Sequence, residues 1–589
     1  MDVGAFFRGR TGLWRTAAVA WLVVAVFLVG KSQAWTGLHD LDTDDVMRLL
    51  QTRDWLAGQA WFDTTQHRGW PAPGYSMHWS RIPDLGLGGL IWLFGLVLPG
   101  AVAETAALIA WPLIQLGAAL VLVGVAARRL GGAPAVAPAM LLFGLLGPAV
   151  WLFVPGRVDH HGLQMIGVLA MLAALLHLRR SAIAGALAGL GGAFSLCVGL
   201  EGLMYWLILC AAAGLVLARD GIAARSAVAA FGLSVAIATP LLAFATNPAR
   251  YVASQVCDQV ALPVLALAVT GGLGLAAAAA LSGGLRAPLA RLAVVTLVGL
   301  AAAAAFAWAG PDCLRGPFAD VDPRLGPVWL DHVQEARSLP WLLGRLDPFG
   351  VAMAVLVAIG LAALGLMLRR RPPLFRHVAV VGALLLSAVA VLFLQVRGIS
   401  YAVAFACPLV AAAMVALARD LGTPPRHWGA AMLAGLIVVV GAPQVGRLVA
   451  GLAAPKSDAS APTAAKGCFD PDRYAVLAGL RPGLAAAPID SGPFILAASP
   501  LSIMSAPYHR NAEGILAAHQ VLAAAPDEAR ALAARFGVRY VVMCRSGAIL
   551  RLKRVAPDGL AARLDAGEVP AWLAPAAAGG GPVQAYRVR

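Results

Sequence analysis

The sequence predicts a polytopic α-helical membrane domain that is followed by a soluble α/β domain. The 589-residue chain is 60% hydrophobic and only 13% charged, and its mean hydropathy is +0.78. Long apolar runs recur from Thr16 to Arg447. Because only helices satisfy their own backbone polar groups in hydrocarbon, and a span needs roughly 20 apolar residues, these runs indicate membrane-spanning helices.

The net charge of +15 does not indicate a nucleic-acid partner. The Lys and Arg residues cluster in short segments between apolar runs, as the positive-inside rule expects for cytoplasmic loops. We therefore expect membrane lipids around the protein and no nucleic acid bound to it.

The apolar runs predict thirteen spans, with the N-terminus inside and the C-terminus outside. The run 85–100 is short and Gly-rich, and we expect it to be membrane-parallel or half-inserted. If it crossed the membrane, the basic junctions at Arg128, Arg179 and Arg219 would face the wrong side. The thirteen spans are expected at 16–33, 103–127, 134–155, 161–178, 181–199, 203–218, 224–246, 261–282, 291–310, 350–368, 377–396, 402–418 and 428–446.

The first apolar run, 16–30, also has the character of a signal peptide. No small-residue cleavage site follows it, which favours a retained helix with the basic "FFRGRTGLWR" in the cytoplasm.

The predicted domains are a membrane domain at 1–450, a linker at 451–467 and a soluble domain at 468–589. Two long outer loops are expected in the membrane domain, at 35–84 and 311–347. The expected elements of the soluble domain are a helix at 514–536 and strands at 538–545 and 582–589.

The seven cysteines support this topology. Cys197, Cys210 and Cys407 fall within spans and are expected to pack as small apolar residues. The other four lie in segments placed outside, where an oxidising compartment permits disulfides. The expected pairs are Cys257–Cys313 and Cys468–Cys544, and free thiols are the alternative.

The first outer loop holds seven aspartates and no glutamate, and four of them fall within "DLDTDD". A helix is expected from Asp44 to Ala57, with Asp42 or Thr43 as its cap. Carboxylates at a membrane surface can bind a divalent cation, accept a proton or stabilise positive charge. A solvated loop with capping aspartates is the alternative.

The segment "FVPGRVDHHGLQ" (153–164) places Asp159, His160 and His161 at the outer end of another span. A carboxylate with imidazoles is an ordinary ligand set for Mn²⁺ or Mg²⁺, and histidine favours the transition metal. A structural His pair is the alternative, but both motifs are expected on one face, as a split metal site requires.

Three further features carry charge on the outer side. Glu335 lies in "DHVQEARS", and Arg397 in "QVRGISY" lies near a span end, where a guanidinium suits a lipid phosphate. The alternative for Arg397 is a snorkelling interface anchor. "APYHRN" carries Tyr508, His509 and Arg510, which would contact an anionic or sugar ligand, or else pack the soluble domain onto the membrane domain.

These motifs resemble the catalytic subunit of oligosaccharyltransferases, which belong to the GT-C class of multi-span glycosyltransferases. The similar features are Asp44 with Arg four positions later, "RDWLAG", "AWFD", "GRVDHH" and "HVQEARS", in that order along the chain. The resemblance implies a GT-C-like membrane domain of about thirteen helices with an outer C-terminal domain.

Carried over by position, the resemblance makes Asp44 and Asp42 catalytic residues and places Glu335 at the acceptor. Asp44, Asp159 and His161 would hold the metal, and Arg397 the donor phosphate. Asp45, Arg48 and His160 are expected to contact substrate, with Tyr508, His509 and Arg510 from the soluble domain. The family has an acidic residue after its His pair where this chain has Gln164, and the family's Trp-Trp-Asp acceptor motif is absent, since Trp572 is the single tryptophan of the soluble domain.

The predicted activity is inverting transfer of a sugar or glycan from a polyprenyl phosphate or diphosphate donor to a glycan, lipid or protein acceptor. The expected location is the periplasmic side of a bacterial inner membrane. Alternatives are a single-sugar transferase acting on a glycolipid or surface polysaccharide without metal, a transporter or flippase, and a scaffold. The scarcity of acidic residues within the spans argues against transport.

Overall fold

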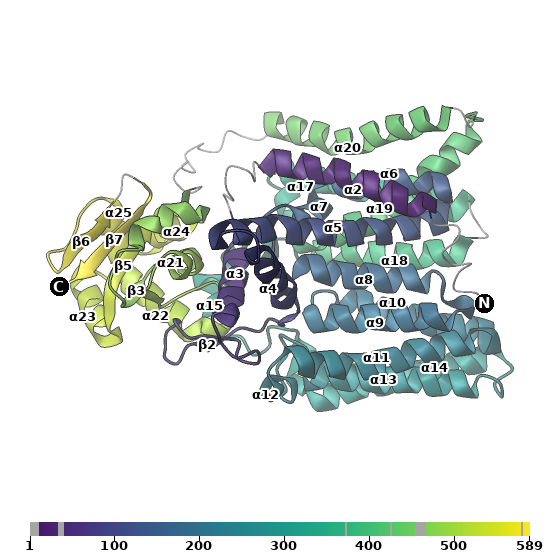
Figure 1. The fold of residues 1–589 in the computed structure, drawn as a ribbon, viewed down its shortest axis with the longest axis horizontal. Helices are drawn as coiled ribbons and strands as arrows, with labels where there is room; N and C mark the ends of the chain where they lie inside the picture. Colours follow the sequence, from purple (N-terminus) through teal and green to yellow (C-terminus); the bar gives the residue numbers. More distant parts are fainter. Residues whose placement is uncertain (1–10, 33–40, 371–373, 425–426, 454–466, 579–580) are drawn as a thin grey trace.

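The computed structural model describes residues 11–32, 41–370, 374–424, 427–453, 467–578 and 581–589. The basic segment 6–10 and most of the predicted linker lie outside these residues. A long helical bundle and a C-terminal domain stacked on one end of it make up the described chain (Figure 1).

Every predicted span coincides with a helix or, in one case, with a bent helix pair. The helices are α2 (Thr11–Ser32), α5 (Gly100–Gly131), the pair α6 (Val136–Leu145) and α7 (Gly147–Val150), α8 (His161–Leu175), α9 (Ala182–Val198), α10 (Leu203–Asp220), α11 (Arg225–Thr246), α13 (Leu262–Leu281), α14 (Pro288–Ala309), α17 (Pro348–Arg370), α18 (Phe375–Leu392), α19 (Ile399–Asp420) and α20 (Trp428–Ala453).

By length and composition, nine helices of the described chain are able to cross a membrane, or ten if the bent pair is one span. This count is lower because α8 and α9 have only 15 and 17 residues, and because α10 and α11 are counted as one apolar stretch. The chain is therefore a multi-pass membrane protein.

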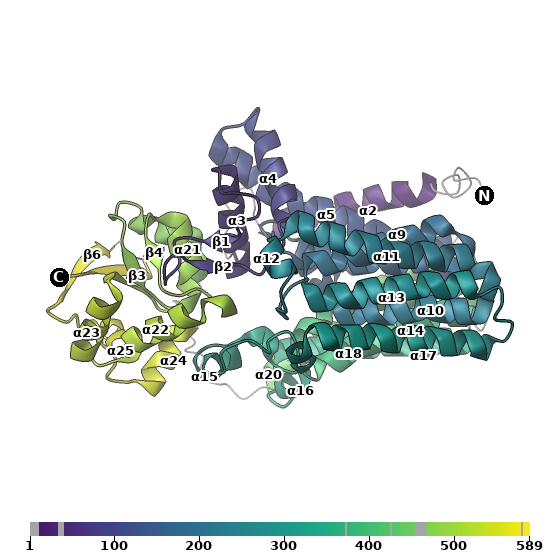
Figure 2. The ribbon, with the colours of Figure 1, turned by 90° about the horizontal axis from the view of Figure 1, so that it is seen from below.

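Two helices run across the direction of the bundle at its C-terminal-domain end (Figure 2): α3 (Thr43–Leu56) and α4 (Ile82–Gly95). The short strands β1 (Thr65–Gln66) and β2 (Tyr75–Ser76) pair antiparallel between them. Helix α4 exposes Trp92 and Leu93, as expected for a helix that lies along a membrane surface.

Helix α19 forms the centre of the bundle, and 94% of its most apolar stretch is buried. It packs against α5, α17 and α18. Because α19 is fixed on several sides, the residues just before it, including Arg397, have a well-defined position at the end of the bundle.

The C-terminal domain is built on a five-stranded mixed sheet of order β4-β3-β5-β7-β6. Strand β3 is parallel to β4 and β5, whereas β7 is antiparallel to β5 and β6. Both predicted strands are confirmed. The strands are β3 (Leu484–Ala486), β4 (Ser502–Ile503), β5 (Val538–Cys544), β6 (Leu573–Ala578) and β7 (Val583–Val588).

The single helix expected at 514–536 is wrong, because the chain forms α22 (Ala512–Ala523) and α23 (Pro526–Phe536) instead. Pro526 stands at the start of α23, where its missing N–H costs nothing, and it prevents α22 from continuing.

Side chains of β5 point alternately into two hydrophobic cores, one on each face of the sheet. Tyr540 and Val542 share one core with Val46 and Met47 of α3, while Val541 lies in the core of the opposite face with residues of α22 and α23. Side chains of a strand point alternately to the two faces. The sheet therefore packs directly against α3, and the first acidic motif forms the beginning of that helix.

Both predicted disulfides are present. Cys257 is bonded to Cys313 and Cys468 to Cys544, while Cys197, Cys210 and Cys407 are free.

Candidate active site

The first acidic motif forms the N-terminus of α3. Asp42 is the N-cap, and its side chain accepts a hydrogen bond from the Asp44 N–H. This confirms the expected helix and one of its two expected caps. Capping by a carboxylate satisfies an orphan N–H and suits the positive end of the helix dipole, so Asp42 and Asp44 are held at one end of the bundle.

Arg157 joins this motif to the second one. Its guanidinium lies 2.9 Å from Asp42, 3.0 Å from Asp45 and 2.6 Å from Asp159. Arg157 was not predicted as a site residue, although "GRVDHH" places it two residues before Asp159. One cation thus brings together carboxylates that are more than a hundred residues apart in sequence.

Asp45 has a structural role in place of the expected substrate contact. Its side chain is fully buried and accepts the N–H groups of Val158 at 2.8 Å and Asp159 at 3.1 Å. Asp45 therefore fixes the loop that carries Asp159, and its carboxylate oxygens are occupied by Arg157 and these two backbone groups.

Arg48 is likewise a structural residue and not the expected substrate contact. It is completely buried and paired with Asp84 at 2.9 Å, and it donates to the Ser80 carbonyl at 3.1 Å. This buried pair joins α3 to the start of α4, and removing one partner would leave a charge unpaired.

His160, His161 and Glu201 form a compact cluster beside Asp159. One ligand atom of each of these three residues lies within 4.8 Å of the others. His160 Nε2 is 3.2 Å and His161 Nε2 is 3.8 Å from Glu201 Oε1, and His161 Nδ1 is 3.1 Å from Asp159 Oδ2. Glu201 was not predicted as a site residue, but a lone glutamate between two apolar runs on the same outer side was the available signal.

Arg397 and Glu335 form an ion pair, with 2.9 Å between the guanidinium Nε and Glu335 Oε2. Arg397 was predicted at the donor phosphate and Glu335 at the acceptor. Glu335, Glu201 and Asp44 supply the negative charges that act on Arg397. The two residues therefore lie at the same site as the acidic motifs.

Asp44 and its neighbour Asp45 both carry carboxyl groups with a raised pKa. Burial, together with the nearby charges of Asp42 and Asp159, raises the pKa of Asp44 to about 7 against the opposite effect of His161. For Asp159, burial opposes ionisation, but Arg157 and His161 hold the pKa well below its usual range. Near neutral pH, ionisation is therefore favoured at Asp159 and disfavoured at Asp44.

The donor set fits a divalent cation. Carboxylates outnumber cationic side chains here, and His160 Nδ1 is buried without a hydrogen-bond partner in the described structure. Of the predicted ligands, Asp159 and His161 are in contact, and the charges of both act on Asp44. Asp44 and Asp159 are not members of the group of described ligand atoms that lie within 4.8 Å of one another, which consists of His160, His161 and Glu201. Glu201 and His160 offer the additional ligand atoms, and imidazole with carboxylate suits Mn²⁺ or Zn²⁺ in particular.

Tyr508, His509 and Arg510 pack the C-terminal domain onto the membrane domain, one of the two expected roles. Tyr508 is buried, and its hydroxyl donates to the Thr43 carbonyl at 3.1 Å. His509 Nε2 lies 2.7 Å from Asp258 Oδ2, and Arg510 donates to the same carboxylate.

Comparison with known proteins identifies the fold. The sequence matches no protein-family model and no curated protein. The structure is similar to the oligosaccharyltransferase AglB of Archaeoglobus fulgidus, solved in complex with an inhibitory peptide and a dolichol-phosphate. The TM-score is 0.64 at 15% identity, covering 91% of this chain and 69% of AglB.

Two further structures of that oligosaccharyltransferase are similar. The form tethered to an acceptor peptide with an NVT sequon has a TM-score of 0.64 at 13% identity, covering 94% of this chain and 72% of that one. The complex with Zn and sulfate has a TM-score of 0.55 at 15% identity, covering 89% and 67%. The chain therefore has the fold of an oligosaccharyltransferase of the GT-C class, a helical membrane domain with a C-terminal sheet domain.

Proposed function

We propose that this protein is a membrane glycosyltransferase of the GT-C class. It transfers a sugar or glycan, with inversion, from a polyprenyl phosphate or diphosphate to an acceptor on the periplasmic side of a bacterial inner membrane. The observation that carries the proposal is a cluster of charged residues in which Asp159 contacts His161 and Glu335 contacts Arg397. The charges of Asp159, His161 and Glu335 all act on Asp44. These residues come from four separate segments.

Arg397 is proposed to bind the donor phosphate. It lies just before α19, and its guanidinium is paired with Glu335 alone among the described ion pairs. A guanidinium binds phosphate oxygens with two parallel hydrogen bonds, so the phosphate would replace or share the contact with Glu335.

Asp44 is proposed to orient and deprotonate the acceptor, with Asp42 beside it. A carboxyl group with a pKa near 7 is matched to accepting a proton at neutral pH. Asp44, Asp159 and His161, with His160 and Glu201 adjacent, would hold a divalent cation, which as a Lewis acid supplies positive charge to the leaving phosphate. Glu335 would position the acceptor beside Arg397.

The acceptor need not carry an Asn-linked sequon. Trp572 is the single tryptophan of the C-terminal domain, and it is buried in the core formed with α22 and α23. It therefore offers no surface for reading a peptide, which favours a glycolipid or surface polysaccharide as acceptor.

Donor binding tests the role of Arg397. Purified protein in detergent is titrated with undecaprenyl phosphate, and bound lipid is counted by native mass spectrometry. Arg397→Gln is expected to weaken binding roughly 10-fold or more, as the loss of a charge-assisted contact of about 1.5–3 kcal/mol predicts. The matched control Arg554→Gln changes an exposed arginine of the C-terminal domain and is expected to bind normally. Equal binding by all three proteins would contradict the proposal.

Catalysis is tested by release of polyprenyl phosphate or diphosphate from a membrane extract that contains polyprenyl-linked sugars. Asp44→Asn is expected to lower the rate roughly 100-fold or more, since it removes both a proton acceptor and a cation ligand. Asp320→Asn, at an exposed aspartate in the loop of Glu335, is the control and is expected to keep wild-type activity. A fully active Asp44→Asn protein would refute the mechanism.

A further inference from the structure

A second cluster of metal-ligating side chains lies outside the candidate active site. His78, Asp258 and His509 each place one ligand atom within 4.8 Å of the other two. They come from three distant parts of the chain, namely the loop between β2 and α4, the loop before α13 and the C-terminal domain. No part of the proposed mechanism uses them.

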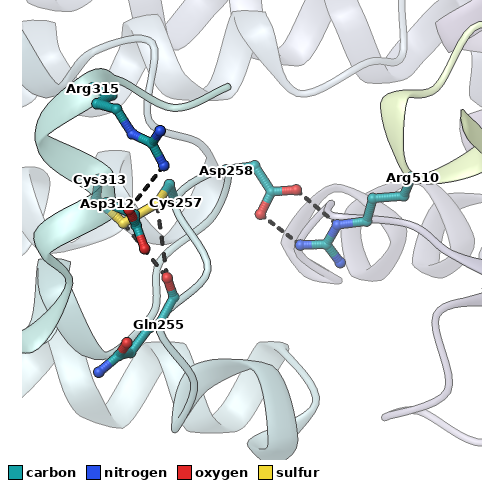
Figure 3. The surroundings of a disulfide bond; sticks show 7 residues. All are labelled: Gln255, Cys257, Asp258, Asp312, Cys313, Arg315 and Arg510. Carbon is teal, nitrogen blue, oxygen red and sulfur yellow. Dashed lines mark hydrogen bonds and ion pairs between the residues drawn. A yellow bond between two sulfur atoms is a disulfide. The ribbon is translucent and has the colours of Figure 1, made fainter. Parts of the chain in front are cut away.

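Only part of this cluster has conventional partners. His509 Nε2 is 2.7 Å from Asp258 Oδ2, and Arg510 binds the same carboxylate through two nitrogens at 2.7 and 2.6 Å. Figure 3 shows the Arg510 guanidinium facing the Asp258 carboxylate. In contrast, His78 Nδ1 is buried and has no hydrogen-bond partner among the described residues. A buried imidazole nitrogen without a partner is costly unless a ligand occupies it.

The cluster is also held firmly in place. Asp258 directly follows Cys257, which is disulfide-bonded to Cys313 (Figure 3). The rings of His78 and His509 have centroids 4.6 Å apart, and the side chains of Asp258 and His509 are only 12% and 11% exposed. A rigid, mostly dehydrated set of donors is what a tight metal site requires.

We propose that His78, Asp258 and His509 bind a zinc ion that fastens the C-terminal domain to the membrane domain. Two imidazoles and a carboxylate are ordinary zinc ligands, and a water would complete the tetrahedron. Two ligand atoms on one tetrahedral zinc lie ~3.3 Å apart, so the 2.7 Å contact of His509 with Asp258 opens slightly as the ion enters. Mg²⁺ is disfavoured because it prefers oxygen ligands.

The zinc ion would position a residue next to the catalytic motif. His509 is preceded by Tyr508, whose hydroxyl donates to the carbonyl of Thr43, the residue before Asp44. Trp79, which follows His78, contacts both Tyr508 and His160 through its ring. The proposed zinc site therefore controls how the C-terminal domain holds the first acidic motif.

Zinc content tests this proposal separately from glycosyl transfer. Full-length protein in detergent is stripped with chelator, reloaded with Zn²⁺ and desalted, and bound zinc is measured by mass spectrometry. To silence the candidate active site, the measurement uses the His161→Gln background. This protein is expected to retain about one zinc per chain, and adding His78→Gln is expected to remove it. The zinc X-ray absorption spectrum of the His161→Gln protein is expected to show two imidazole ligands, and this signal is expected to be lost when His78→Gln is added.

Arg510→Gln in the same background is the matched control. It removes the ion pair to Asp258 but none of the three ligands, so zinc retention is expected to persist. The proposal would be overturned if the zinc content per chain were equal with and without His78→Gln. It would also be overturned if the His161→Gln protein retained no zinc. Either result leaves the role of Asp44 in transfer unaffected, and a zinc-dependent rise in melting temperature that His78→Gln abolishes would support the fastening role.

Discussion

At the residue scale, several carboxylates of the candidate site share one cation, Arg157. Arg157 contacts Asp42, Asp45 and Asp159, but no described ion pair neutralises Asp44. Burial and its acidic neighbours therefore raise the pKa of Asp44 to about 7. The pKa of Asp45 is also raised, to about 8, because burial outweighs its contact with Arg157. What distinguishes Asp45 from Asp44 is that Arg157 and two backbone N–H groups occupy its carboxylate oxygens.

The pKa of Asp44 predicts how cation binding depends on pH. Because the pKa of Asp44 is raised to about 7, a cation that binds below pH 7 must displace a proton from it, which contributes up to about tenfold in Mn²⁺ affinity per pH unit there. Burial lowers the pKa of His161, but Asp159 and Glu201 outweigh it and raise that pKa to about 9, so loss of the His161 proton adds a further rise that continues above pH 7. Electron paramagnetic resonance of free Mn²⁺ measures this affinity between pH 5.5 and 8. Asp44→Asn is expected to show a shallower slope, because the histidines contribute equally to both proteins. Identical slopes would show that Asp44 does not hold the cation.

At the element scale, two disulfides fix the segments that frame the site. Cys257–Cys313 holds the loop of Asp258 to the loop after α14. Cys468–Cys544 ties the beginning of the C-terminal domain to the end of β5, the strand that packs against α3. These bonds restrain connections that the hydrophobic bundle does not hold.

The second disulfide makes a testable contribution to stability. The double variant Cys468→Ser with Cys544→Ser is expected to lose about 2–4 kcal/mol from the free energy of unfolding of the C-terminal domain, measured by chemical denaturation in detergent. Cys210→Ser, at a free cysteine, is the control. Alkylation of denatured protein should modify three cysteines before reduction and all seven after it. Modification of seven without reduction would rule out both bonds.

At the scale of the whole molecule, the C-terminal domain and the first long loop are built together. Arg68 donates to the carbonyls of Leu496 at 2.7 Å and Ser499 at 2.8 Å. The backbone of Ile503 in β4 donates to the Arg68 carbonyl and accepts from the Trp70 N–H. The loop thus adds to the edge of the domain's sheet, next to the core shared with α3.

Loss of Arg68 is expected to loosen this attachment. Arg68→Gln removes charge-assisted hydrogen bonds of about 1.5–3 kcal/mol, so amide hydrogen exchange at β4 is expected to become roughly 10- to 100-fold faster. Arg539→Gln is the matched control, because exposed Arg539 also donates to a carbonyl, that of Pro482, but within the domain. If β4 exchanges equally slowly in all proteins, Arg68 does not contribute to the attachment.

Most of the helices of this protein can be predicted from the sequence alone, because the length of an apolar run and the position of the charges beside it are properties of a single segment. The thirteen helices, the Asp42 cap, β5 and β7 and both cysteine pairs were predicted and are present. The break at Pro526 and the strands β3, β4 and β6 were missed, because those strands are short or consist mainly of alanine and depend on neighbours for their pairing.

Tertiary structure alone decided which charged residues meet. Asp45 and Arg48 have the same sequence signal as Asp44, yet folding buries both in structural contacts. Arg157, Glu201 and the His78–Asp258–His509 cluster gain their meaning only from partners far away in the chain. Hydropathy is a property of a segment and can be read along the sequence, whereas an ion pair or metal site depends on distances between segments, which only packing sets.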